Sequence, residues 1–303
     1  MRAGPSAAIL DVVLLLAACS PARPDDAAFS VFASGIPAPR AVAAAGGRIH
    51  VLDGTGRLLT FDAAGREILA LELVKTARGF PAGIVVAEDG RLFVADAHES
   101  RVLILSPDGG KLGSFGRYGS RPGEFVYPQR IAFLEGETFV TEFGFEENNR
   151  VQVFGPGGEF RRAFGGFGTS GLRFQRPCGI AVTPGGDLLV ADASHRVLRI
   201  SPDGVHRGDI GRPGREPGAL DYPFGLAADA DHLFVCEYGT NRVSRFRHDG
   251  AFAGCFAPPP KDPASFLHPR DLSLDGRFLF VADTGRDRIV RLAPDRLRWE
   301  GTP

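Results

Sequence analysis

Six carboxylates recur along the chain, each closing an apolar run and each followed by an arginine four to eight residues later. The acids are Asp53, Asp96, Glu142, Asp192, Glu237 and Asp283, and the arginines are Arg57, Arg101, Arg150, Arg196, Arg242 and Arg288. A ring of carboxylates could perform general acid–base chemistry. Six equivalent arginines would neutralise it, however, and a pair repeated six times suits one scaffolding role. We therefore expect each pair to brace a turn through a charge-assisted hydrogen bond.

A second set of residues differs from repeat to repeat and is the better candidate for recognition. Its members flank six regularly spaced prolines or follow the acids, and Tyr and Arg, which recognition surfaces favour, are prominent among them. The predicted ligand-binding residues are Arg40, Tyr127, Gln129, Arg176, Tyr222, Phe224, Tyr238, His268 and Arg270. The longest turn on the same face, from Phe143 to Asn149, adds Phe145, Glu146 and Glu147. Ordinary packing at the rim of the fold is the alternative reading of each residue.

The histidines do not predict a metal site. His98, His195 and His268 fall in turns expected on one face, but zinc needs ligands at about 2.1 Å, and turns on a rim lie too far apart for that. The chain has neither a Gly-x-Ser-x-Gly elbow nor a cysteine with an evident histidine partner. We therefore predict no metal, no cofactor and no catalytic residue.

The elements that must position these residues repeat about every 46 residues. A proline opens each unit, at Pro39, Pro81, Pro128, Pro177, Pro223 and Pro269. An apolar strand follows, then a tight turn, a strand ending in the acid, a third strand opened by the arginine, a second turn and a fourth strand. A four-stranded sheet with two apolar faces must stack against its neighbours, and closing the stack into a ring leaves no bare end. The sequence thus predicts an all-β, six-bladed β-propeller of four-stranded antiparallel blades over residues 28–303.

Two segments could supply the last strand of the sixth blade. Residues Phe29 to Phe32 precede Pro39 just as other fourth strands precede their prolines, whereas Leu297 to Glu300 would supply the strand locally. We favour the N-terminal strand, because joining both chain ends in one blade ties the ring shut.

The N-terminus has the pattern of an export signal. Arg2 is followed by an apolar run from Ala7 to Ala18 that is too short to cross a bilayer as a helix and is interrupted by Asp11. The run leads to Cys19 in the sequence Leu-Ala-Ala-Cys-Ser, which resembles the lipobox of bacterial lipoproteins. Residues 1–18 are therefore predicted as a signal peptide and 19–27 as a lipidated cysteine with a tether. An ordinary signal peptide with a chance cysteine is the alternative.

Composition narrows the functional classes. The net charge is −1, which removes the basic footprint of a nucleic-acid binder. Gly and Pro together make up 63 residues, 40 and 23 respectively, which argues against a helical protein. Without Cys19 the chain retains Cys178, Cys236 and Cys255, an odd number that cannot pair completely. The sequence does not decide whether Cys178 and Cys236 form a disulfide bond.

The glycine-rich links and the acid–arginine turns resemble those of the NHL-repeat family. The stretches from Gly116 to Pro128 and from Gly211 to Pro223 carry this resemblance, as does Val281 to Ile289. It covers about residues 28–295 and implies a six-bladed propeller. Related propellers include peptide-amidating lyases, whose zinc-binding histidines follow the strand-opening proline. This chain has no histidine at any of those six positions.

Two functions follow from these observations. The favoured one is a monomeric, non-catalytic binding scaffold, lipid-anchored to the bacterial cell envelope with the outer membrane favoured, which presents its channel-mouth face to a protein, peptide or glycan. The alternative is a propeller enzyme of the lyase or lactone-hydrolase type with its site at the same channel mouth. Nucleic acid is not expected as a partner.

Overall fold

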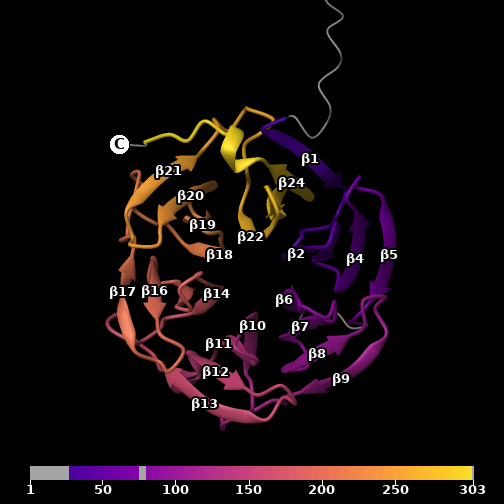
Figure 1. The fold of residues 1–303 in the computed structure, drawn as a ribbon, viewed down its shortest axis with the longest axis vertical. Coiled ribbons are helices and arrows are strands. Elements are labelled where there is room, and N and C mark those ends of the chain that lie inside the picture. The colour runs from indigo at the N-terminus through magenta and orange to yellow at the C-terminus, as the bar shows by residue number, and fades with distance from the viewer. Residues whose placement is uncertain (1–26, 75–79, 302–303) are drawn as a thin grey trace, which may run out of the picture.

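Short apolar runs separated by glycine-containing turns form 24 β-strands within residues 27–74 and 80–301, which are the residues that the computed structural model describes. The strands form six four-stranded antiparallel sheets arranged around a central axis (Figure 1). This confirms the predicted six-bladed β-propeller. The predicted signal peptide, Cys19 and nearly all of the tether lie outside the described residues.

Each of the first five blades takes four consecutive strands, ordered from the axis outward. Blade 1 contains β2 (Ala41–Ala45), β3 (Arg48–Leu52), β4 (Arg57–Asp62) and β5 (Glu67–Glu72). Blade 2 contains β6 (Pro81–Val86), β7 (Leu92–Asp96), β8 (Arg101–Leu105) and β9 (Lys111–Phe115). Blade 3 contains β10 (Tyr127–Leu134), β11 (Glu137–Phe143), β12 (Arg150–Phe154) and β13 (Phe160–Gly165). Blade 4 contains β14 (Pro177–Val182), β15 (Leu188–Asp192), β16 (Arg196–Ile200) and β17 (His206–Ile210). Blade 5 contains β18 (Pro223–Ala228), β19 (His232–Glu237), β20 (Arg242–Arg247) and β21 (Phe252–Phe256).

The sixth blade joins the two ends of the chain. It contains β22 (Pro269–Asp275), β23 (Phe278–Asp283), β24 (Arg288–Leu292) and, on its outer edge, the N-terminal strand β1 (Phe29–Ser34). Strand β1 runs antiparallel to β24 (Figure 1). The N-terminal closure is therefore confirmed, and a ring held this way cannot open without breaking a sheet.

The C-terminal segment does not form the fourth strand of blade 6, so the alternative closure is wrong. It lies instead against the outer strand of blade 5, where Cys255 and Glu300 exchange both backbone hydrogen bonds at 2.9 and 2.8 Å. Trp299 is buried there, with its ring 5.9 Å from that of Phe234. Burial of this tryptophan, together with the occupation of the β24 edge by β1, accounts for the path.

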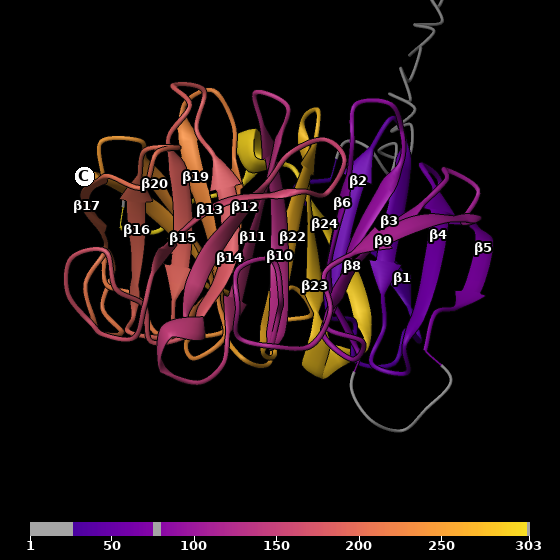
Figure 2. The ribbon, with the colours of Figure 1, turned by 90° about the horizontal axis from the view of Figure 1, so that it is seen from below.

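Apolar side chains fill the spaces between neighbouring blades. One cluster joins Val151 and Val153 of blade 3 to Ile180 and Val190 of blade 4, all buried. Equivalent clusters join the other neighbours, so each blade is covered on both faces. The blades stand side by side with their loops at the two ends of the ring (Figure 2). Among the described residues, no helix has the length and apolar character needed to cross a membrane.

The innermost strands approach each other closely, and glycine makes this possible. At Gly179 on β14, a Cβ atom would lie 2.2 Å from the carbonyl oxygen of Phe224 on β18. Because that oxygen belongs to the backbone of a central strand, it cannot move aside cheaply. Glycine at this position therefore permits the close approach of β14 and β18 beside the channel.

Candidate functional site

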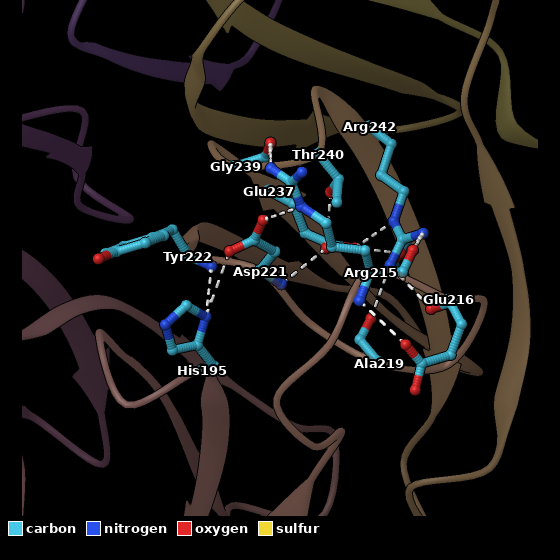
Figure 3. A network of polar contacts seen from close by, with 11 residues as sticks. His195, Arg215, Glu216, Ala219, Asp221, Tyr222, Glu237, Gly239, Thr240 and Arg242 are labelled. Atoms are coloured by element: carbon cyan, nitrogen blue, oxygen red, sulfur yellow. Dashed lines mark hydrogen bonds and ion pairs between the residues drawn. The ribbon is translucent and has the colours of Figure 1, made fainter.

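The acid–arginine pairs are structural braces. In five of the six repeats the arginine Nε or terminal nitrogen lies 2.7 to 3.1 Å from the acid of its own turn. Glu237 is typical: it is fully buried and accepts hydrogen bonds from Arg242 Nε (2.7 Å), Thr240 Oγ1 (2.8 Å) and the backbone N–H of Asp221 (3.0 Å) (Figure 3). The acid thus ties its turn to the link that enters the same blade. This confirms the predicted bracing role.

Blade 4 departs from this pattern. Arg196 pairs with Asp209 on β17 at 2.7 Å, and its Nε donates to Ser194 Oγ at 3.1 Å. Asp192 instead accepts the backbone N–H groups of Gln175 and Arg176 at 2.9 and 2.8 Å and the hydroxyl of Ser194. The predicted direct pair is therefore wrong here, because the short side chain of Ser194 stands between the two charges.

A second repeated contact ties neighbouring blades together on the same face. In three of the six repeats the residue before the strand-opening proline has a positive φ, and its backbone N–H donates to a side chain of the preceding blade. Ala38 donates to Asp287 Oδ1 (2.7 Å), and His268 donates to Asn241 Oδ1 (2.6 Å). Tyr222 donates to His195 Nδ1 at 3.1 Å (Figure 3). His195 therefore joins blades 4 and 5.

The other two histidines considered for a metal site have different surroundings. The ring of His268 stacks on that of Tyr238, with centroids 4.4 Å apart, and His98 Nε2 lies 3.5 Å from Glu99 Oε1. Within residues 27–74 and 80–301, no group of three or more His, Cys, Asp or Glu side chains is arranged to hold a metal ion.

A pocket of about 540 Å³ opens at the mouth of the channel, on the face where the inner strands begin. Eight of the nine residues predicted for ligand binding line this channel-mouth pocket; the ninth, His268, stacks on its wall residue Tyr238. The structure therefore brings residues from all six blades to one place. The full lining is Arg40, Phe80, Ala82, Ala97, Tyr127, Gln129, Arg130, Phe143, Arg176, Cys178, Ala193, Tyr222, Pro223, Phe224, Tyr238 and Arg270.

Three arginines of the pocket lie against aromatic rings and not against carboxylates. The guanidinium carbon of Arg40 is 3.1 Å from the ring centre of Phe80, that of Arg176 is 4.5 Å from Phe143, and that of Arg270 is 4.9 Å from Phe224. Within the described residues none of these guanidinium groups donates a hydrogen bond or forms an ion pair, and the Nε atoms of Arg40 and Arg270 are buried without an acceptor. Such groups are costly to leave unpaired.

Burial and mutual repulsion act on these charges together. Burial, with the nearby charges of Arg270 and Arg130, lowers the pKa of Arg40 to about 10. The pKa of Arg270 is also lowered, first by burial and then by Arg130. The charged form of both Arg40 and Arg270 is thus disfavoured by burial and by their cationic neighbours. An anion bound among these arginines would stabilise the charged form of each.

A buried ion pair closes the bottom of the pocket. Arg130 of blade 3 and Asp271 of blade 6 come from opposite sides of the ring and meet with Nε and Oδ1 3.3 Å apart. Arg130 also donates to backbone carbonyl groups of blades 1 to 3, including Arg40 O at 3.0 Å, and Asp271 Oδ2 accepts the N–H of Val42. A second cavity of about 250 Å³ lies beyond the pair, which divides the channel in two. Burial raises the pKa of Asp271, and Arg130 opposes that rise.

This pair was not among the predicted site residues, although the sequence carries a signal for it. Arg130 and Asp271 stand two residues after their prolines, where the other repeats have Ala41, Gly83, Gly179 and Gly225. Two opposite charges three blades apart, in an otherwise small-residue position, would have predicted a contact across the axis.

The three described cysteines are free, so Cys178 and Cys236 form no bridge. Cys178 lines the pocket, but burial raises the pKa of its thiol to about 12. Because the thiolate is the nucleophile, a thiol that stays protonated at neutral pH is a packing residue.

Comparison with known proteins agrees with the architecture. No protein-family model matches the chain. Protein brain tumor of Drosophila melanogaster is 29% identical over 122 residues, which span 40% of this chain and 11% of that protein. The match supports the NHL-type repeat that the sequence predicts, and it covers only a small part of the relative's length.

Solved six-bladed structures of several kinds resemble the chain. A streptogramin B lyase superimposes with a TM-score of 0.63 at 15% identity, over 87% of this chain and 96% of the lyase. A gluconolactonase from Xanthomonas campestris gives 0.63 at 16%, over 88% and 89%. Nidogen, from its complex with laminin, gives 0.63 at 19%, over 84% and 93%. At these identities the likeness establishes the shared fold, and function must come from the site.

Proposed function

We propose that this chain is a non-catalytic binding propeller, lipid-anchored to the cell envelope, that recognises an anionic group of a protein, peptide or glycan partner in its channel-mouth pocket. One observation carries the proposal. Arg40, Arg176 and Arg270 line a single pocket, and none of them has an anionic partner among the described residues.

Guanidinium groups are suited to this role because their planar donors match the two oxygens of a carboxylate or phosphate. The aromatic rings beneath the guanidinium groups hold these charges in the pocket and leave their N–H donors available to a ligand. In the free protein the arginines repel one another, so the binding of an anion relieves repulsion as well as forming new contacts. A pocket of about 540 Å³ has the size of a small-molecule site or of a few residues of a larger partner.

An enzymatic role is less well supported by the same pocket. A histidine-to-alanine variant of virginiamycin B lyase from Staphylococcus aureus is catalytically inactive, whereas the described residues lining this pocket include no histidine, aspartate or glutamate. Asp271, just below, is engaged by Arg130 and Val42. General acid–base catalysis needs a titratable group within reach of the substrate, and the lining offers only arginine, tyrosine and a protonated thiol.

The anchoring part of the proposal rests on the sequence around Cys19 and has its own test. In bacterial cells the full chain should fractionate with membranes, and Cys19→Ala should move it to the soluble fraction. If the variant still fractionates with membranes, the lipid anchor is refuted while the binding function is untouched.

Two probes of equal shape and different charge test the binding function. Biphenyl-4-carboxylate and biphenyl-4-carboxamide are titrated calorimetrically into the full chain in detergent. We expect the carboxylate to bind with a dissociation constant of roughly 0.1–1 mM, from about 0.3 kcal/mol per non-hydrogen atom, and at least tenfold tighter than the amide. Replacing Arg40 and Arg270 together by Gln should abolish the difference. Equal binding of the two probes to the original chain refutes the proposal.

A further inference from the structure

A second depression continues outward from the channel-mouth pocket over blades 3 and 4. This lateral groove is lined by Phe143, Gly144, Phe145, Glu146, Asn149, Phe167, Gln175 and Arg176 and encloses about 640 Å³. It shares Phe143 and Arg176 with the channel-mouth pocket, so the two spaces adjoin at these side chains. A single extended ligand can occupy both.

The lateral groove exposes aromatic side chains that the fold does not use. Phe145 is 73% exposed and Phe167 is 56% exposed, whereas Phe125, Phe139, Phe154, Phe174, Phe234 and Phe246 are fully buried. Their rings come from separate segments, the loop after β11 and the link that enters blade 4. Large apolar side chains gathered at one exposed place, beside a polar pocket, indicate a contact surface for a partner.

The loop that carries Phe145 has a defined turn held by its own contacts. It forms a 3-10 turn, η2 (Glu146–Asn148), and the amide of the buried Asn149 donates to Glu146 O at 2.9 Å. Gly144 has no room for a side chain, because a Cβ would lie 2.8 Å from that of Val126. A preformed loop lowers the entropic cost of binding.

The charges that line the two adjoining spaces favour one orientation of a ligand that occupies both. The channel-mouth pocket is lined by four arginines and by no acid, whereas the lateral groove carries Glu146 beside Arg176. An anionic group is therefore favoured at the channel mouth and disfavoured near Glu146. The apolar part of the same ligand then lies over Phe145 and Phe167.

We propose that the ligand is an extended peptide, with a carboxylate held by Arg40, Arg176 and Arg270 and an apolar side chain a few residues away packed on Phe145 and Phe167. This inference rests on the proposed function and specifies its partner. A peptide is favoured over an acidic glycan because three phenylalanine rings line the lateral groove, two of them exposed, while Asn149 among its polar residues is buried and bound to the loop backbone. A glycan would lose hydrogen bonds to water over these rings, whereas an apolar side chain gains from burial there. The carboxylate can be the C-terminus of the peptide or an Asp or Glu side chain.

An array of random hexapeptides, synthesised once with C-terminal carboxylates and once with C-terminal amides, tests the inference. The full chain, fluorescently labelled and in detergent, is applied with and without oligogalacturonate as a competing acidic glycan. The groove variant is Phe145→Ser with Phe167→Ser. The matched control is Leu112→Ser with Val205→Ser, which replaces two residues that are similarly exposed, at 58% and 60%, outside the groove.

We expect bound peptides to combine a carboxylate with an aromatic or aliphatic side chain. The groove variant should bind these peptides at least tenfold more weakly than the original chain. The control variant should bind the peptides within twofold of the original chain, and the groove variant should bind biphenyl-4-carboxylate within twofold of it. Loss of binding on amidation identifies the C-terminus as the anion, and retention with a requirement for Asp or Glu identifies a side chain.

Three results overturn the inference. They are unchanged peptide binding by the groove variant, binding of no peptide, and displacement of bound peptide by oligogalacturonate at equal carboxylate concentration. The proposed function fails separately, when biphenyl-4-carboxylate and biphenyl-4-carboxamide bind the original chain equally.

Discussion

Removing a positive charge from the channel-mouth pocket should stabilise the fold while it weakens binding. A pKa of about 10 for Arg40, against 12.5 in water, reflects burial and the charges of Arg270 and Arg130. At about 1.4 kcal/mol per pH unit this corresponds to roughly 3 kcal/mol against the charged form. Arg40 is only partly buried, and solvent screening reduces this to about 1.5 kcal/mol.

The replacement Arg40→Gln also loses the contact of the guanidinium with Phe80, which costs about 0.5–1 kcal/mol. The net expectation is a free energy of unfolding higher by about 0.5–1 kcal/mol at pH 7 and low salt. For a domain of this size the melting temperature should rise by about 1–4 °C. Urea unfolding in 10 mM and in 500 mM sodium chloride measures the effect. The gain should shrink in high salt because the repulsion is partly screened.

Arg57→Gln is the matched control, because Arg57 is bound 2.8 Å from the fully buried Asp53. This variant leaves a buried carboxylate unpaired and should lose about 1–3 kcal/mol. If Arg40→Gln is destabilising at low salt, or if both variants lose equal stability, Arg40 is a structural arginine. Its charge is then not held in reserve for a ligand.

Three further predictions concern the scaffold, and urea unfolding measures each. Phe32→Ala should lower the free energy of unfolding by about 2–3 kcal/mol, because the ring of Phe32 on β1 packs against aromatic rings of blades 1 and 6. The control Val31→Ala, at a half-exposed neighbour, should change the free energy of unfolding by less than about 0.5 kcal/mol. Equal losses in the two variants would show that β1 does not close the ring. Gly179→Ala should cost at least about 1–3 kcal/mol, because the new Cβ meets a backbone oxygen of blade 5, whereas Gly113→Ala on β9 has open space and should be nearly neutral; a tolerated Gly179→Ala contradicts the close approach of the inner strands. His50 is buried, and burial with the nearby Arg48 lowers its pKa to about 4. Below about pH 6.5 His50 is therefore protonated in the unfolded chain but stays neutral in the folded chain, so up to about 3 kcal/mol of stability present above pH 6.5 should be lost as the pH falls to 4. His50→Gln should remove that part of the pH dependence. An unchanged profile of stability against pH in this variant would refute the assignment to His50.

The repeat carries the fold, which is why the fold could be predicted. Each proline, tight turn and acid–arginine pair acts over a few residues, and six copies of the same pattern reinforce one interpretation. The pairing of Glu237 with Arg242 follows from such local spacing. The failure at Arg196 is equally local, since Ser194 lies in the same turn and intercepts the charge.

The residues predicted for ligand binding differ between repeats and lie at positions that a propeller brings to one face, and eight of the nine line one pocket. Comparison of one repeat with another cannot predict which of these residues contact each other in the folded ring. The pairing of Arg130 with Asp271 spans 141 residues and depends on the two lying on opposite blades of a closed ring.

The amino-acid sequence by itself determined the number of blades, the strand order within them and the face that carries the variable residues, because these depend on short-range periodicity. Only the tertiary structure decided that Arg40, Arg176 and Arg270 line one pocket without a carboxylate partner. It also decided that Arg130 and Asp271 close the floor of this pocket, and that the C-terminal segment joins blade 5 and not blade 6. These features depend on ring closure, which brings together residues from blades that are distant in sequence and leaves their charges to be balanced in the channel.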